Sequence, residues 1–136
     1  MIVVDTNILA YLYLPSEFSQ QAEQLLEREP HWMAPLLWRS ELRNVLALYL
    51  RRELLTLDQA YAVQTEAEAL LADAEYEVPS LDVLKLVQES ECSAYDCEFV
   101  ALAKRFNAKL VTADKKILKE FPAIAISLPV ALAAHP

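Results

Sequence analysis

Four acidic residues stand out because each occupies a position unlike that of an ordinary surface acid. Asp5 and Asp114 each follow a short apolar run, while Glu41 and Asp96 fall in line with apolar residues at helical spacing. Carboxylates that fold together without cations repel one another, so some of them would have to stay protonated. Three or four carboxylates without a histidine form the ligand set of a hard cation, Mg²⁺ or Mn²⁺. We therefore expect an acidic metal centre if the fold brings these residues together.

Glu41 gives the strongest of the four signals. Trp38 lies three residues before it and Val45 four residues after it, so all three side chains share one face of a helix. A carboxylate on a core-facing row is costly unless it is paired or bound to a metal. Arg39 or Arg43 could pair with it, although Arg39 is only two residues away and faces elsewhere. We favour a functional role for Glu41.

Asp96 also lies on an inward row, because Phe99 and Val100 follow it at three and four residues. The segment Ser93-Ala94-Tyr95-Asp96 also fits a helix capping box, in which an acid at this position serves only the helix start. Both roles can hold together, since the first turn of a helix can point into a crevice.

The residues before Asp5 form a β-branched run without alternation, which is typical of a strand buried on both faces of a parallel sheet. Ligands of such sheets bind outside the carboxyl ends of the strands, where Asp5 would lie. Asp114 follows the second clear strand, at 109–112, although a plain helix N-cap also explains it. Asp5 has the same ambiguity, and Asn7 or Thr6 could cap the following helix instead.

The remaining pattern predicts an α/β fold with a small, mostly parallel central sheet flanked by helices, in one domain spanning 1–136. We expect the residues after 127 to form a C-terminal tail, because two prolines make this segment poor helix material. Proline at position 35 suits the first turn of the longest helix. The predicted helices are 8–14, 17–29, 35–53, 57–74, 81–89, 94–107 and 115–121. Further short strands are predicted at 31–34 and 123–127, and residues 76–78 fit either a short strand or an extended link.

Composition excludes several classes of protein. The 136 residues include 55% hydrophobic and 24% charged residues, and the absence of glycine rules out glycine-built phosphate loops. No apolar run is long enough to span a bilayer and no signal peptide is evident, so we expect a cytoplasmic protein without a membrane partner. The net charge of −8 argues against binding nucleic acid by bulk electrostatics, but cations held at an acidic centre reverse the local charge.

The histidines, the cysteines and the remaining acids do not indicate a second functional site. Two histidines are too isolated for a zinc site, and two cysteines five residues apart are expected to be reduced. We interpret one acidic group as an ordinary solvated face. Its members are Glu66, Glu68, Asp73 and Glu75.

In four segments the chain resembles the PIN-domain ribonucleases, in particular the small VapC-type toxins of bacterial toxin–antitoxin pairs. Each motif is weak alone, but the ordered set is specific and spans nearly the whole chain. The segments are Val3-Val4-Asp5-Thr6-Asn7-Ile8-Leu9, Ser40-Glu41-Leu42-Arg43-Asn44-Val45-Leu46, Ser93-Ala94-Tyr95-Asp96 through Phe99-Val100-Ala101-Leu102-Ala103, and Leu110-Val111-Thr112-Ala113-Asp114.

The resemblance implies a role for each matching residue in a PIN-like fold. Asp5, Glu41 and Asp96 match the central acidic triad, and Asp114 matches the acid assigned to a second metal position. Two matching polar residues, Asn7 and Thr112, would orient the acids or the attacking water.

Some relatives carry a further acid shortly after the position of Asp114, where this chain has Lys115, Lys116 and Ile117, so one or two metals remain possible. The resemblance also implies an RNA substrate, a cognate antitoxin and a homodimer.

The sequence thus predicts a Mg²⁺- or Mn²⁺-dependent endoribonuclease that uses a metal-activated water. Four cationic residues near the acids are candidates for holding RNA phosphates: Arg39, Arg43, Lys115 and Lys116. A haloacid-dehalogenase-like phosphatase would need an acid where Asn7 stands, and a phosphoacceptor receiver domain would need adjacent acids near the start. A non-catalytic PIN-like binding module stays open as the alternative.

Overall fold

A five-stranded parallel sheet forms the centre of the protein, which a computed structural model describes over residues 1–136. The order of the strands is β3-β2-β1-β4-β5. The predicted α/β class with a small parallel sheet is therefore confirmed. The strands are β1 (Ile2–Val4), β2 (Trp32–Pro35), β3 (Glu75–Tyr76), β4 (Lys109–Val111) and β5 (Ala125–Ile126).

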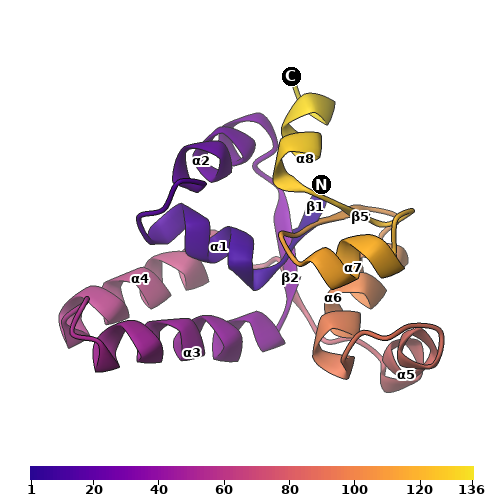
Figure 1. Cartoon of the computed structure of the whole chain (residues 1–136), viewed down its shortest axis with the longest axis horizontal. Helices are drawn as coiled ribbons and strands as arrows, with labels where there is room; N and C mark the ends of the chain where they lie inside the picture. Colours follow the sequence, from indigo (N-terminus) through magenta and orange to yellow (C-terminus); the bar gives the residue numbers. More distant parts are fainter.

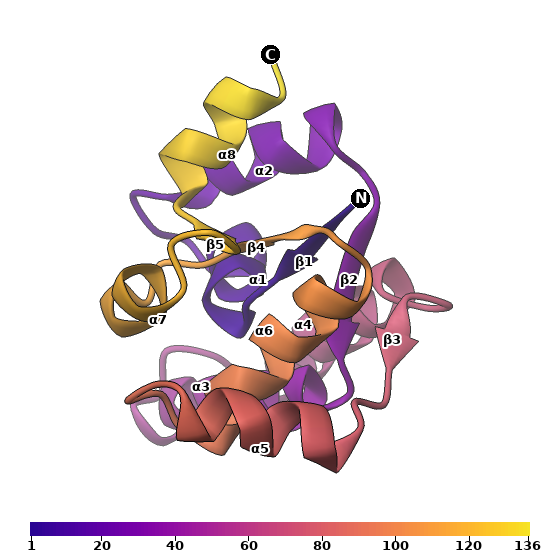
Figure 2. The same cartoon turned by 90° about the vertical axis from the view of Figure 1, so that its right-hand side faces the viewer.

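The order of the strands reverses direction at β1. The chain runs outward from β1 through β2 to β3, and then returns to place β4 on the free side of β1 (Figure 2). Val4 at the end of β1 pairs in register with Val111 at the end of β4. The residues that follow these two, Asp5 and Thr112, therefore leave neighbouring strands at the same edge. Such a reversal point is where open α/β sheets bind their ligands.

Eight helices surround the sheet, and three of them position the site. α1 leaves the end of β1, α3 leaves the end of β2 and pairs with α4, and α6 packs against β1, β2 and β4 (Figure 1). The helices are α1 (Thr6–Tyr13), α2 (Ser19–Arg28), α3 (Leu37–Arg51), α4 (Leu57–Leu70), α5 (Ser80–Gln88), α6 (Ala94–Arg105), α7 (Lys115–Glu120) and α8 (Leu128–Ala134).

Two predicted helix starts were wrong. Pro35 is the last residue of β2 and is buried, and α3 begins two residues later, at Leu37. α1 begins at Thr6 instead of Ile8, because the Asp5 side chain accepts a hydrogen bond from the Thr6 backbone N–H at 2.8 Å. The cap is thus Asp5 itself, and the chain turns from strand to helix without a loop.

The C-terminal segment is a helix and not the predicted tail. The Ser127 side chain accepts from the Val130 backbone N–H, and Pro129 lies in the first turn of α8, where a backbone N–H has no helical partner in any case. Leu128 and Ala131 are buried, and the helix packs against α2. Burial of this apolar face provides what the local sequence lacks.

Cys92 and Cys97 form no disulfide, in agreement with the predicted reduced state, and both side chains are buried. No helix combines the length and the apolar composition needed to cross a membrane.

Candidate active site

Asp5 is a buried carboxylate that three neighbours hold in place. It is 8% exposed, and its Oδ1 accepts from the Thr6 backbone N–H. Its Oδ2 accepts from Thr112 Oγ1 at 2.7 Å and from Asn7 Nδ2 at 3.3 Å. The end of β1 and the end of β4 are therefore connected through one carboxylate.

Thr112 and Asn7, both predicted site residues, extend this network to the loop after β4. Thr112 is fully buried and its Oγ1 accepts from the Asp114 backbone N–H at 3.0 Å, while Asn7 Oδ1 accepts from the Ala113 backbone N–H at 3.2 Å. One hydroxyl thus contacts both Asp5 and the backbone of Asp114. The hydrogen bonds restrict the positions of both acids.

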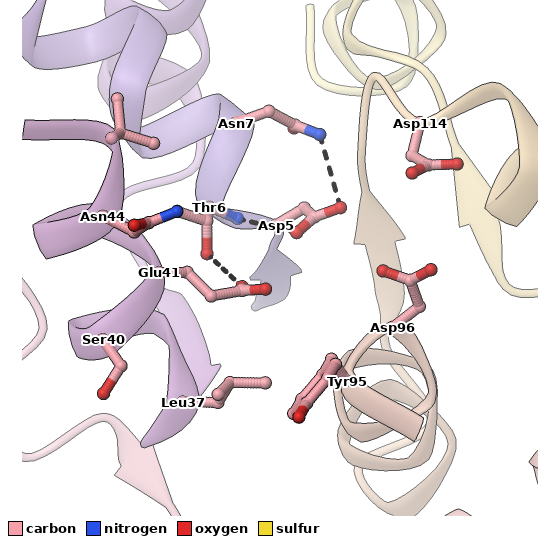
Figure 3. Close-up of a pocket in the computed structure, with 11 residues that line it drawn as sticks. Asp5, Thr6, Asn7, Leu37, Ser40, Glu41, Asn44, Tyr95, Asp96 and Asp114 are labelled. Atoms are coloured by element: carbon pink, nitrogen blue, oxygen red, sulfur yellow. Dashed lines mark hydrogen bonds between the residues drawn. The ribbon is translucent and has the colours of Figure 1, made fainter. Parts of the chain in front are cut away.

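Glu41 approaches the same point from the second turn of α3. Thr6 Oγ1 donates a hydrogen bond to Glu41 Oε1 at 2.7 Å (Figure 3). The Glu41 side chain is half-buried, and neither Arg39 nor Arg43 forms an ion pair with it. Thr6 was not predicted to contact any of the four acids, because 35 residues separate it from Glu41 and no local pattern connects them.

Asp96 and Asp114 each combine a helix start with a place in the site. Ser93 caps α6 by accepting from the Asp96 backbone N–H at 3.1 Å, and the Asp96 carboxylate points into the cavity. Asp114 caps α7, because its Oδ1 accepts from the Lys116 and Ile117 backbone N–H groups at 2.8 and 3.1 Å. For both residues, the capping and functional interpretations are compatible.

All four predicted acids line one cavity of about 480 Å³ at the carboxyl edge of the sheet. Figure 3 shows Asp5 and Glu41 on one side of this cavity, with Asp96 and Asp114 on the other. The complete lining is Asp5, Thr6, Asn7, Leu37, Ser40, Glu41, Asn44, Val45, Tyr95, Asp96 and Asp114.

Burial and repulsion from neighbouring acids raise the pKa of three carboxyl groups in the cavity. Burial is the main cause that raises the pKa of Asp5, Glu41 and Asp96 above the ordinary carboxyl values. Negative neighbours add to it: Asp96 and Asp114 act on Asp5, Asp5 and Asp96 act on Glu41, and Asp114 acts on Asp96. Positive charge brought into the cavity would therefore be stabilised.

The chemistry of these donors fits a hard divalent cation. All four acids provide oxygen, and no lysine or arginine forms an ion pair with any of them. In this arrangement, however, no three Asp, Glu, His or Cys side chains are grouped closely enough to hold one metal ion. Repulsion between uncompensated carboxylates favours such an open arrangement.

The candidate cationic residues differ in how free they are. Arg39 is already engaged by acids of α4 and β3: its Nε and Nη2 donate to Glu75 at 2.7 Å each, and its Nη1 donates to Glu68 at 3.1 Å. Trp38 Nε1 also donates to Glu75. The interpretation of Glu68 and Glu75 as ordinary solvated acids was therefore wrong.

The other three cations, Arg43, Lys115 and Lys116, are exposed and form no ion pair. Lys116 is near enough to Asp96 for its charge to lower the pKa of that carboxyl, against the stronger effect of burial.

Besides Thr6, five uncharged lining residues were not predicted as part of the site. Leu37, Asn44 and Val45 lie four residues before, three after and four after Glu41, so helical spacing could have found them. Ser40 and Tyr95 directly precede the acids Glu41 and Asp96.

Comparison with known proteins agrees with this architecture. The family model described as the PIN domain matches residues 2–124. The chain belongs to the PIN-domain family. A curated relative, Ribonuclease VapC3 from Pyrobaculum aerophilum, is 33% identical over 127 residues, which cover 90% of this chain and 96% of the relative.

Solved PIN-like structures share the fold at lower identity. PAE2754 from Pyrobaculum aerophilum has a TM-score of 0.72 at 22% identity, covering 98% of this chain and 94% of that one. FitAcB from Neisseria gonorrhoeae has a TM-score of 0.73 at 18% identity, and a toxin–antitoxin complex from Klebsiella pneumoniae has 0.67 at 20%. Each of these two alignments covers 94% of this chain and 98% of the other. At 18–22% identity, the similarity to these structures shows a shared fold and nothing further.

Proposed function

We propose that this PIN domain is a metal-dependent endoribonuclease, the toxin of a toxin–antitoxin pair, that hydrolyses RNA phosphodiesters. The observation that carries the proposal is the convergence of Asp5, Glu41, Asp96 and Asp114 on one cavity, where none of them forms an ion pair with a lysine or arginine. The 33% identity to a protein named as a ribonuclease supports the choice of RNA as the substrate.

The four carboxylates would hold one or two Mg²⁺ or Mn²⁺ ions, with Asp114 serving a second position. A bound ion would lower the pKa of a water molecule, and its own positive charge would lie beside the phosphodiester. The protein's own contribution is to place the acids: Thr112 and Asn7 hold Asp5, and Thr6 holds Glu41. Hydrolysis by water, rather than attack by the 2′-hydroxyl, leaves a 5′-phosphate and a 3′-hydroxyl.

Exposed cations beside the cavity would bind the flanking phosphates of the RNA. Arg43, Lys115 and Lys116 are free to do so, whereas a contact from Arg39 would compete with its bonds to Glu75 and Glu68. In solution we expect a homodimer. An antitoxin with a basic segment would suit the net charge of −8, and structural neighbours that include toxin–antitoxin complexes support such a partner.

The decisive experiment measures RNA cleavage with and without Mg²⁺ for the wild type and Asp5→Asn. Asp82→Asn, an exposed acid of α5 outside the cavity, is the matched control. We expect wild-type cleavage that EDTA abolishes, a loss on the order of 100-fold or more for Asp5→Asn, and an unchanged control. Equal cleavage by wild type and Asp5→Asn, or cleavage that resists EDTA, would contradict the mechanism.

One observation favours the second candidate, a PIN-like module that binds but does not cleave. The acids are not grouped closely enough for three of them to hold one ion without rearrangement. A calorimetric Mg²⁺ titration separates the two functions: binding of the ion without cleavage of any RNA supports the binding module, and binding with cleavage supports the nuclease.

A further inference from the structure

One part of the cavity has no charge and is not needed to hold a cation. Its lining comes from α3, which contributes Leu37, Ser40, Asn44 and Val45, and from the first turn of α6, which contributes Tyr95. Figure 3 shows the Leu37 and Tyr95 side chains facing one another across the opening, beside the carboxylates of Glu41 and Asp96. A cavity of about 480 Å³ also exceeds what an ion requires and lies within the roughly 300–1,000 Å³ range of sites for small organic groups.

Tyr95 is unusual among the aromatic residues of this protein. Its side chain is 64% exposed although it lines a cavity, and its hydroxyl forms no hydrogen bond within the chain. Both close aromatic pairs of the structure lie elsewhere, at Tyr11–Phe18 and Tyr76–Phe106. Neither face of the Tyr95 ring therefore packs on another aromatic ring, and a flat apolar surface is left at the rim.

The Tyr95 ring lies next to the acids at which a phosphodiester would react. Tyr95 immediately precedes Asp96, and the side chains of both residues line the same cavity. A phosphate at the acids therefore has its own nucleotides beside this ring and beside Leu37. Unpaired nucleobases are commonly bound by stacking on aromatic side chains, an interaction that tolerates every base because each has a flat π-face.

We propose that Tyr95, with Leu37 opposite it, forms a slot that stacks the nucleobase next to the scissile phosphodiester. This inference rests on the proposed ribonuclease function and adds a substrate-positioning residue to it. The slot accepts a base only after that base has left its helical stack, so the site selects unpaired RNA over duplex RNA. The uncharged α3 side chains Ser40 and Asn44 lie in the same cavity, where polar groups meet the edges of the bound nucleotide.

The test compares Tyr95→Ala, Tyr95→Leu and Tyr95→Phe in steady-state cleavage of a short single-stranded RNA whose cleavage site has first been mapped with the wild type. Tyr61→Ala is the matched control, since Tyr61 is 70% exposed on α4 and lies outside the cavity. Stacking binds substrate and transition state alike, so its loss raises KM and leaves kcat nearly unchanged. We expect KM to rise about 5- to 150-fold for the alanine variant. Tyr95→Leu should show a smaller rise, while Tyr95→Phe and Tyr61→Ala should match the wild type.

A second measurement does not depend on cleavage. In EDTA, the wild type should quench the fluorescence of a single-stranded RNA that carries 2-aminopurine beside the mapped site, and Tyr95→Ala should not. An abasic nucleotide at that site should raise KM for the wild type and have little further effect on Tyr95→Ala. This loss of additivity indicates that ring and base contact one another.

Three results would overturn the inference. The first is a KM for Tyr95→Ala equal to that of the wild type. The second is a Tyr95→Phe variant as impaired as the alanine variant. The third is a change in the oligomeric state of Tyr95→Ala in sedimentation, which would mean that a second copy of the chain covers the ring. These results leave ribonuclease activity itself intact. If the wild type neither cleaves nor binds RNA, the proposed function fails and the slot fails with it.

Discussion

Replacing Thr112 by valine removes one hydroxyl group and keeps the shape of the side chain. Thr112 is fully buried, and its Oγ1 donates to Asp5 Oδ2 at 2.7 Å. A hydrogen bond to a charged group contributes about 1.5–3 kcal/mol to stability, and Asp5 is too buried for water to take the place of the hydroxyl freely. We therefore expect Thr112→Val to lower the free energy of unfolding by about 1.5–3 kcal/mol near neutral pH in EDTA.

The cost should depend on pH because Asp5 already titrates abnormally. Burial raises the pKa of Asp5 above 3.8, and the Thr112 hydrogen bond opposes this, so the valine variant should raise it further. A raised pKa in the folded state means that the folded protein binds this proton more tightly than the unfolded chain. The variant's deficit is therefore complete above the raised pKa and shrinks as the pH falls through it. Once Asp5 is protonated, its hydrogen bond with Thr112 joins two neutral groups, and the deficit in the free energy of unfolding should fall to about 0.5–1.5 kcal/mol.

Urea unfolding of wild type and variant at about pH 7 and about pH 4 measures this deficit, since other groups cancel in the difference between the two proteins. Thr112→Ser is the matched control: it keeps the hydroxyl and loses a methyl group, at about 0.5–1.5 kcal/mol at either pH. A valine variant within about 0.5 kcal/mol of the wild type would refute the reasoning, as would a deficit that is the same at both pH values.

Two further substitutions test contacts that no local sequence pattern indicated. Glu75→Gln should cost about 1 kcal/mol at neutral pH, because Arg39, whose side chain is 37% exposed, loses a charged partner. The pKa of Glu75 is lowered from 4.5, so the stabilisation by the ion pair is present above pH 4.5 and is lost as the pH falls through the lowered pKa. The urea unfolding curves of variant and wild type should therefore converge at low pH. A difference that stays constant with pH would contradict the ion pair. Leu128→Ala should cost about 2–5 kcal/mol in the same assay if α8 is packed on α2, whereas Val130→Ala, at a position 53% exposed, should cost far less. Equal small costs would mean that the segment behaves as a tail.

The acids of the site were predictable because each leaves a local signal in the sequence. Asp5 and Asp114 follow strand-like runs, and Glu41 and Asp96 fall on apolar rows of helices. The helix signals depend on the side-chain period of 3.6 residues, and the strand signals depend on short β-branched runs; neither needs a distant contact. These local patterns predicted most helices and four of the five strands to within a few residues, whereas the region of β3 was left open between a strand and an extended link.

Local signals failed where a distant partner decided the outcome. Glu75 is an unremarkable acid in the sequence, and only packing of α3 beside β3 brings it to Arg39, 36 residues away. The last helix looked like a tail because proline lowers local propensity, and burial against α2 overrides that preference.

The sequence by itself therefore determined which side chains could bind a cation, and at which strand ends and helix faces they lie. Only the tertiary structure decided that they share one cavity. The register of β1 with β4 sets Asp5 beside Thr112, 107 residues later, and the α3 packing sets Glu41 beside Thr6. The physical reason is that hydrogen-bonded periodicity acts over a few residues, whereas strand order and helix packing depend on burying the apolar faces of the whole chain at once.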